Sequence, residues 1–166
     1  MSDYKAIYEQ SLTDPEGFWA AQARRLEWAV APRRVLDQSR PPFTRWFVDG
    51  QLSITHNCID RHLARFAAKP AFICEGNLAQ ETATRTYAQL HEEVELLARF
   101  LASLGLGRGD RAVIYMPMII QTPIAMLAVA RLGAIHSVVF GGFSAKELSN
   151  RVCDCEPTLL ISASCG

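Results

Sequence analysis

The sequence predicts an α/β fold in which an N-terminal wrap, made of helices and irregular chain, precedes the beginning of a doubly wound parallel sheet. Three short apolar runs, at 111–116, 135–140 and 157–162, are separated by two stretches with helical features. Continuous apolar runs are typical of strands that are buried on both faces of a parallel sheet. The resulting order is strand, helix, strand, helix, strand (βαβαβ), which is the start of a doubly wound sheet.

The first helix of this sheet is expected over residues 124–132, which carry Ala, Met, Leu and Val on every side. Thr122 is the expected N-cap, because Pro123 then occupies the first helical position, where a missing N–H costs nothing. Gly133 is expected to end the helix.

The second connection begins with a diglycine turn. Gly141 and Gly142 follow the strand 135–140, and Ser144 with Glu147 forms a Ser-x-x-Glu capping box that predicts the start of another helix. The third strand is then followed only by Ser-Cys-Gly near the last residue. We therefore expect the sheet to be truncated, with no covering helix and no closing strand after it.

Residues 1–60 are expected to form an N-terminal extension that lies on a larger body, and residues 61–166 the incomplete first part of that body. Thr-Asp-Pro-Glu at 13–16 predicts a helix start, and a shorter helix is expected before it. Residues 30–47 lack a steady period and indicate an irregular connection. Its expected apolar anchors are three aromatic side chains: Phe43, Trp46 and Phe47.

Between the extension and the sheet, residues 57–66 have helical spacing, and 70–75 and 85–87 are expected to form a hairpin across a polar loop at 76–84. The clearest amphipathic helix follows, because Thr86 and Gln89 form a capping box. Its expected core positions are Leu90, Val94, Leu97, Leu101 and Leu104, and Gly105 is expected to end it.

The composition is that of a globular protein with no anionic macromolecular partner. The chain of 166 residues is 49% hydrophobic, with 17 basic and 17 acidic residues, so neither nucleic acid nor a membrane surface is an expected partner. Residues 112–130 contain no charge and would also fit a membrane span, but Pro117 and Pro123 divide them, which favours a buried strand and helix. The N-terminus has neither a secretory h-region nor an Arg-rich transit stretch, so a cytoplasmic location is expected, with the mitochondrial matrix as the alternative.

Several chemistry-bearing patterns favour structural roles. Five cysteines without Cys-x-x-Cys spacing indicate reduced thiols rather than a disulfide framework. No metal site is expected, because the candidate ligands lack a fourth partner at suitable spacing. These candidates are His56, Cys58 and His62, and separately Cys153, Cys155 and Cys165. The glycines at 105, 107 and 109 precede a strand, which favours a turn over a dinucleotide fingerprint.

Two further patterns, a histidine in a strand and three scattered arginines, also favour structural roles. His136 is expected to be a satisfied core histidine, since it lies within an apolar strand. Arg45, Arg61 and Arg85 are expected to be solvated or ion-paired rather than to bind polyanions.

The best candidate site is the Gly141–Ser144 turn. It lies at the carboxyl end of a predicted strand and opens a capped helix, a position where open α/β sheets bind ligands, often through phosphates. A tight turn that merely needs glycine is an equally good interpretation of the residues alone.

Long segments of the chain resemble the short-chain acyl-CoA synthetases, the AMP-forming acetyl-CoA and propionyl-CoA synthetase group of adenylate-forming enzymes. The segments that carry the resemblance are RWFVDGQLSITHNCIDRHL, YAQLHEEVELLARFLASLGLGRGDRAVIYMPMI and ARLGAIHSVVFGGFSAKELSNRV. The upstream SLTDPEGFW and VLDQSRPPFTRWF resemble the propionyl branch more than the acetyl branch.

The resemblance implies a two-step ligase that uses a short-chain carboxylate, ATP with Mg²⁺, and CoA. It places Phe140, Gly141 and Gly142 along the CoA channel and assigns no catalytic residue to this chain. In the family, the phosphate-binding loop, the ribose aspartate, the hinge and the adenylation lysine lie in segments that would follow residue 166. We therefore expect the segment alone to be inactive, the alternative being a noncatalytic module that binds CoA weakly or a protein partner. Propionate and acetate both stay open as the substrate.

Overall fold

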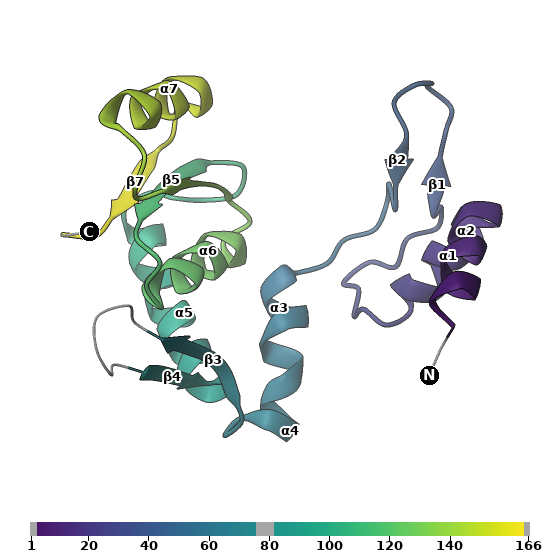
Figure 1. The fold of residues 1–166 in the computed structure, drawn as a ribbon, viewed down its shortest axis with the longest axis horizontal. Helices are drawn as coiled ribbons and strands as arrows, with labels where there is room; N and C mark the ends of the chain where they lie inside the picture. Colours follow the sequence, from purple (N-terminus) through teal and green to yellow (C-terminus); the bar gives the residue numbers. More distant parts are fainter. Residues whose placement is uncertain (1–2, 76–81, 165–166) are drawn as a thin grey trace. The chain divides into compact units, whose positions relative to one another are not determined.

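A computed structural model describes residues 3–75 and 82–164 and divides the chain into two compact units (Figure 1). The first unit runs to Asn57 and the second begins at Cys58. Each is described by itself.

The first unit contains helices α1 (Tyr4–Thr13) and α2 (Pro15–Ala23) and a small antiparallel pair, β1 (Leu36–Asp37) with β2 (Arg45–Trp46). The predicted start of α2 is confirmed: the Asp14 carboxylate accepts the Gly17 N–H at 3.0 Å, and Pro15 occupies the first helical position. The helix before it, expected to be shorter, is longer by one residue, with 10 residues against 9.

Two of the three predicted aromatic anchors pack within the first unit. The Trp46 ring lies 6.2 Å from the rings of both Trp19 and Phe47, and Phe47 lies 5.5 Å from Trp28. Phe43, in contrast, is 78% exposed, so its prediction as an anchor is wrong. It lies in the connection between β1 and β2, outside both strands.

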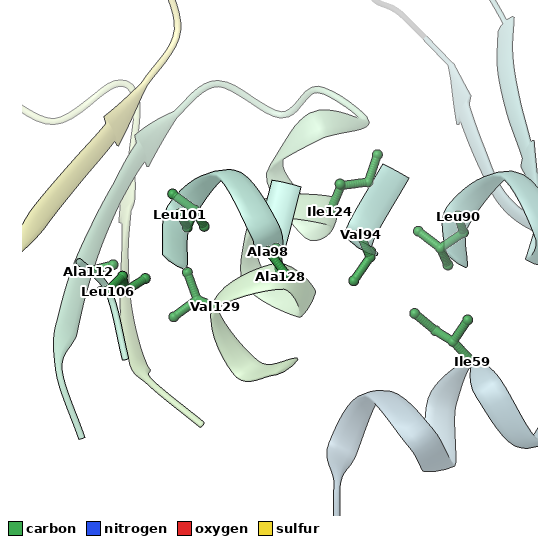
Figure 2. Packing of buried hydrophobic residues seen from close by; sticks show 10 residues of the cluster. All are labelled: Ile59, Leu90, Val94, Ala98, Leu101, Leu106, Ala112, Ile124, Ala128 and Val129. Carbon is green, nitrogen blue, oxygen red and sulfur yellow. The ribbon is translucent and has the colours of Figure 1, made fainter. Parts of the chain in front are cut away.

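The single helix expected over 57–66 is broken into three pieces: α3 (Ile54–Cys58), the 3₁₀ turn η1 (Asp60–His62) and α4 (Leu63–Phe66). Ile59, between the first two pieces, leaves the helical region with φ −125° and ψ −65° and is fully buried. Figure 2 shows its side chain directed towards Leu90 and Val94. Burial of this side chain overrides the helical propensity of the segment.

The predicted hairpin is confirmed as β3 (Pro70–Glu75) paired antiparallel with β4 (Thr82–Thr86). Of its expected polar loop, residues 76–81 lie outside the described residues, and 82–84 belong to β4. Helix α5 (Tyr87–Ser103) starts with the predicted capping box, in which the Gln89 N–H donates to Thr86 Oγ1 at 3.3 Å and the Thr86 N–H donates to Gln89 Oε1 at 3.0 Å.

Helix α5 contributes most of one face of the core of the second unit. Its predicted positions Leu90, Val94 and Leu101 are buried, whereas Leu104 caps the helix and is exposed. The buried cluster extends from α5 to the helix and strand of the first sheet crossover (Figure 2). Its members are Ile59, Leu90, Val94, Ala98, Leu101, Leu106, Ala112, Ile124, Ala128 and Val129.

The predicted parallel sheet is confirmed. Strands β5 (Arg111–Met116), β6 (Ile135–Phe140) and β7 (Leu159–Ser162) are parallel and lie in the order β6-β5-β7, so the first strand in the chain is central. Helices α6 (Gln121–Arg131) and α7 (Ala145–Cys155) connect them in the predicted βαβαβ order.

Helix α6 begins earlier than predicted, at Gln121, so Thr122 is inside the first turn and is not the N-cap. The Thr122 hydroxyl instead donates to the Pro117 carbonyl oxygen at 2.8 Å, which ties the start of the helix to the end of β5. Gly133 follows the last turn with φ +70°, as expected for a helix end.

The two connecting helices cover opposite faces of the sheet. Ala112, Ile114 and Met116 alternate along β5 and pack against α6, while Arg111 and Tyr115 point to the other face and contact the ends of the α7 segment. Figure 1 likewise shows α7 separated from α5 and α6 by the strands. The fold is therefore doubly wound over its described part.

Strand β6 is less buried than its apolar run predicts. Of its six residues, only Val139 is buried, because β6 has a neighbour on one side only within the described part of the sheet. His136 is consequently half-buried rather than a core histidine. No helix in the described residues is long and apolar enough to cross a membrane, and the uncharged stretch 112–130 is divided between β5 and α6.

Candidate functional site

The turn that joins β6 to α7 contains the predicted site residues. Phe140 is the last residue of β6, Gly141 and Gly142 follow it, and the Phe143 N–H closes the turn on the Phe140 carbonyl oxygen at 3.0 Å. Ser144 is the N-cap of α7, and its hydroxyl accepts the Glu147 N–H at 3.4 Å. The predicted capping box is half formed, because over residues 140–150 the return bond from the Ser144 N–H to the Glu147 side chain is absent.

Gly141 allows the ends of β5 and β6 to approach closely. A Cβ atom on Gly141 would lie 3.0 Å from the Met116 carbonyl oxygen and 3.1 Å from the Pro117 nitrogen. A Cβ atom on Gly142 would lie 2.6 Å from the ring of Phe140. Neither glycine has a positive φ, so close packing and not backbone conformation explains these two residues.

The side chain of Tyr115 anchors the turn from the central strand. Its hydroxyl lies 3.0 Å from the Gly141 carbonyl oxygen and 2.9 Å from the Phe143 carbonyl oxygen. At the other end of the same strand, the Arg111 guanidinium donates to the carbonyl oxygens of Cys155 and Glu156, at 2.9 and 3.0 Å. Two side chains of β5 thus hold both ends of α7, and Arg111 places a positive charge at its negative end.

The outer surface of the turn is aromatic and cationic. The rings of Phe140 and Phe143 are 56% and 42% exposed and meet nearly perpendicularly, with centroids 5.9 Å apart. The Arg151 guanidinium lies 5.4 Å from the centre of the Phe143 ring. Rings, a cation and main-chain N–H groups suit the binding of a ligand with both apolar and anionic parts, not acid–base or nucleophilic chemistry.

The other candidates considered from the sequence are placed elsewhere. Among residues 3–75 and 82–164 there is no group of three His, Cys, Asp or Glu side chains that could hold a metal ion. His56 instead pairs with Glu27, Nε2 to Oε2, at 2.6 Å. The four described cysteines, Cys58, Cys74, Cys153 and Cys155, are free thiols, and Cys165 lies outside the described residues.

The remaining arginine and glycine patterns have structural partners. Arg45 pairs with Asp37 at 3.1 Å and Arg85 with Glu93 at 2.5 Å, as expected for ion-paired arginines. The glycine-rich stretch is the predicted turn: Gly105 and Gly109 have positive φ, and the Gly107 N–H donates to the Asp110 carboxylate at 2.7 Å.

Family models match both units of the chain. The model described as "AMP-binding enzyme" matches residues 59–165, and that described as "Acetyl-coenzyme A synthetase N-terminus" matches residues 4–58. The chain belongs to the AMP-binding enzyme family. This membership confirms the resemblance that the three long segments suggested.

Known members of the AMP-binding enzyme family are similar over nearly the whole chain. Propionate–CoA ligase of Escherichia coli (strain K12) is 46% identical over 163 residues, which are 98% of this chain and 26% of that protein. Acetyl-coenzyme A synthetase of Streptomyces coelicolor is 51% identical over 160 residues, 96% of this chain and 24% of that protein. The chain thus spans about a quarter of the length of these relatives.

A solved structure supports the fold. Acetoacetyl-CoA synthetase from Streptomyces lividans superposes with a TM-score of 0.88 at 27% identity, covering 98% of this chain and 25% of that protein. The α/β fold with a parallel sheet is therefore that of the corresponding part of an AMP-binding enzyme of this family.

Sequence reasoning missed Tyr115 and Arg111, the two residues that attach the turn and α7 to the sheet. A signal was available, since both have polar ends and lie four residues apart in a strand that is otherwise aliphatic or sulfur-containing. That spacing places them on one face of the strand, where polar ends need partners.

Proposed function

We propose that this chain is the N-terminal part of an AMP-forming acid–thiol ligase that joins a short-chain carboxylate, acetate or propionate, to CoA. The observation that carries the proposal is the 45–51% identity, over 96–99% of the chain, to proteins named propionate–CoA ligase and acetyl-coenzyme A synthetase. In the first step the carboxylate attacks the α-phosphate of MgATP, giving an acyl-adenylate and pyrophosphate. In the second, the CoA thiol attacks the acyl carbonyl carbon and AMP leaves.

The turn at Phe140, Gly141 and Gly142 is the proposed contact with CoA. Two exposed aromatic rings, the nearby Arg151 and the turn's main-chain N–H groups are complementary to a ligand that combines an apolar arm, amide groups and phosphates. The site lies beyond the carboxyl end of β6, where open α/β sheets bind their ligands.

The 166-residue chain alone is proposed to be inactive. Adenylation depends on neutralising the charge of the transferred phosphate with a loop, Mg²⁺ and a cationic side chain. The described residues contain no cluster that could hold the metal. Residues 1–60 would serve as the N-terminal extension and 61–166 as the first part of the large domain. The active protein would work in the cytoplasm on small molecules.

The test is a comparison of the two half-reactions in the full-length protein. Carboxylate-dependent exchange of pyrophosphate into ATP reports adenylation, and thioester formation reports both steps. We expect both with propionate and acetate, and the ratio of the two kcat/KM values identifies the preferred acid. Absence of exchange with every short carboxylate contradicts the proposed function, and turnover by the 166-residue chain contradicts its inactivity.

A further inference from the structure

We propose that Tyr115 is a positioning residue for CoA. By holding the carbonyl groups of Gly141 and Phe143 towards the sheet, it turns the N–H groups of Gly142 and Ser144 towards the ligand. The inference rests on the proposed function, because it takes the turn as the CoA contact.

Tyr115 lies in the central strand of the sheet. It is a half-buried residue of this strand, β5, and its side chain lies on the face of the sheet opposite to Ile114 and Met116. Its hydroxyl lies 3.0 Å from the Gly141 oxygen and 2.9 Å from the Phe143 oxygen, which are two residues apart in the turn. A hydroxyl has one proton to donate, so the two carbonyl groups share it.

Peptide geometry sets the direction of two N–H groups in the turn. The peptide bonds that follow Gly141 and Phe143 are trans, and in a planar trans peptide the C=O and N–H bonds point in opposite directions. When Tyr115 draws the two carbonyl oxygens inwards, the N–H groups of Gly142 and Ser144 must point away from it. Over the described residues neither N–H has a hydrogen-bond partner, whereas the Phe143 N–H between them is bonded to Phe140.

The N–H groups of Gly142 and Ser144 are suited to a ligand that carries hydrogen-bond acceptors. Two outward N–H groups, beside the half-exposed rings of Phe140 and Phe143, can donate to phosphate or amide oxygens of a ligand whose apolar arm lies on the rings. CoA carries all three features. Fixing the donors before the ligand arrives lowers the conformational cost of binding.

Tyr115→Phe in the full-length protein tests the role, because it removes the hydroxyl and keeps the ring. We expect KM for CoA to rise about five-fold, the value of one neutral hydrogen bond. The kcat at saturating CoA and the carboxylate-dependent pyrophosphate exchange, which needs no CoA, should stay at wild-type values. Tyr87→Phe is the matched control, since the Tyr87 ring packs near His62 and its hydroxyl bonds no described residue.

A second measurement keeps the inference testable if Tyr115→Phe folds poorly. In the wild-type protein, residue-resolved amide hydrogen exchange should slow at Gly142 and Ser144 when CoA is added, and change little at Phe143, which is already bonded. An unchanged KM for CoA in Tyr115→Phe, or CoA protection at neither amide, overturns the positioning role while wild-type turnover leaves the proposed function intact. A wild-type protein with neither pyrophosphate exchange nor thioester formation overturns both.

Discussion

The guanidinium of Arg131 donates two hydrogen bonds to the carboxylate of Asp60, at 2.6 and 3.2 Å, although the residues are 71 positions apart in the chain. Arg131 also pairs with Glu95 at 2.8 Å, and His91 Nδ1 lies 3.2 Å from Asp60. The Arg131 side chain is only 18% exposed, so this cluster joins η1, α5 and α6 in a mostly desolvated place. As the last residue of α6, Arg131 also meets the negative helix end.

Arg131→Met is expected to lower the free energy of unfolding by about 2 kcal/mol, because it removes the guanidinium that the partly buried carboxylates of Asp60 and Glu95 share. Arg131→Lys should lose less stability than Arg131→Met, since lysine keeps the positive charge but cannot form the bidentate hydrogen bonds. Urea unfolding followed by far-ultraviolet circular dichroism measures both. Arg99→Met, at an exposed position of α5, should stay within about 0.5 kcal/mol of wild type. Equal losses at the two positions would contradict a special role for Arg131.

Ile59→Ala is expected to cost about 3 kcal/mol, because it leaves a cavity beside Leu90 and Val94 in the main core. Ile54→Ala is a matched control in the same segment, since Ile54 is 57% exposed and should change stability by less than about 0.5 kcal/mol. Thermal unfolding of the two variants measures the difference. A small effect of Ile59→Ala would mean that burial of this side chain does not explain the break in the predicted helix.

Gly141→Ala and Gly142→Ala should differ in how much stability they lose, although the two residues are neighbours. At Gly141 the new methyl group meets the backbone of Met116 and Pro117, which cannot move without disturbing the ends of two strands, so a loss of about 1–2 kcal/mol is expected. At Gly142 it meets only the exposed ring of Phe140, which can rotate away. Melting temperatures should therefore fall clearly for the first variant and little for the second. The reverse order would show that the close approach of the strand ends is misassigned.

The stability of the first unit should depend on the ionisation of Asp37. Hydrogen bonds from Ser39, then from Arg45, with the nearby charge of Arg34, hold the pKa of this carboxyl far below its usual value. In the unfolded chain the group takes up a proton near pH 4. The unfolded state then binds more protons than the native state, so this contribution is complete above about pH 4 and is lost as the pH falls below it.

Asp37→Asn should therefore lower the stability of the first unit at pH 6. The fall in stability between pH 6 and pH 3 should also be smaller in this variant than in the wild type. All three tryptophans, Trp19, Trp28 and Trp46, belong to the first unit, so their fluorescence during urea unfolding reports that unit alone. Some pH dependence should persist, because the Arg33 backbone N–H also lowers the pKa of Asp49. Asp154→Asn, in α7, is the control, and the stability of its first unit should match that of the wild type at each pH. An unchanged pH profile in Asp37→Asn would contradict the assignment.

The sequence predicted the parallel sheet and most helices because their signals are local. The apolar runs of β5 and β6, the capping box at Thr86 and the helix end at Gly133 each depend on a few neighbouring residues. The break at Ile59 could not be predicted in this way, because it results from contacts with α5, some thirty residues later in the chain. Phe43 was misjudged for a related reason: being aromatic favours burial, but tertiary packing decides it.

The turn that carries the candidate site was predictable from sequence, but the contacts that hold the turn were not. Two glycines between a strand and a capped helix mark such a turn from sequence alone. The order β6-β5-β7 brings Met116 and Tyr115 to that turn across a strand pair, a neighbour relation that a one-dimensional pattern does not contain.

Helix α7 has no buried residue. Hydrogen bonds from Tyr115 hold the turn before it, and hydrogen bonds from Arg111 hold its C-terminal end. A helix held in this way can open locally at a low free-energy cost, since its release breaks a few hydrogen bonds and exposes little buried apolar surface. Its local opening should therefore cost much less than unfolding α5 or α6. Of the two helices that connect the sheet strands, the one next to the proposed CoA contact is thus better able to move when a large cofactor enters or leaves.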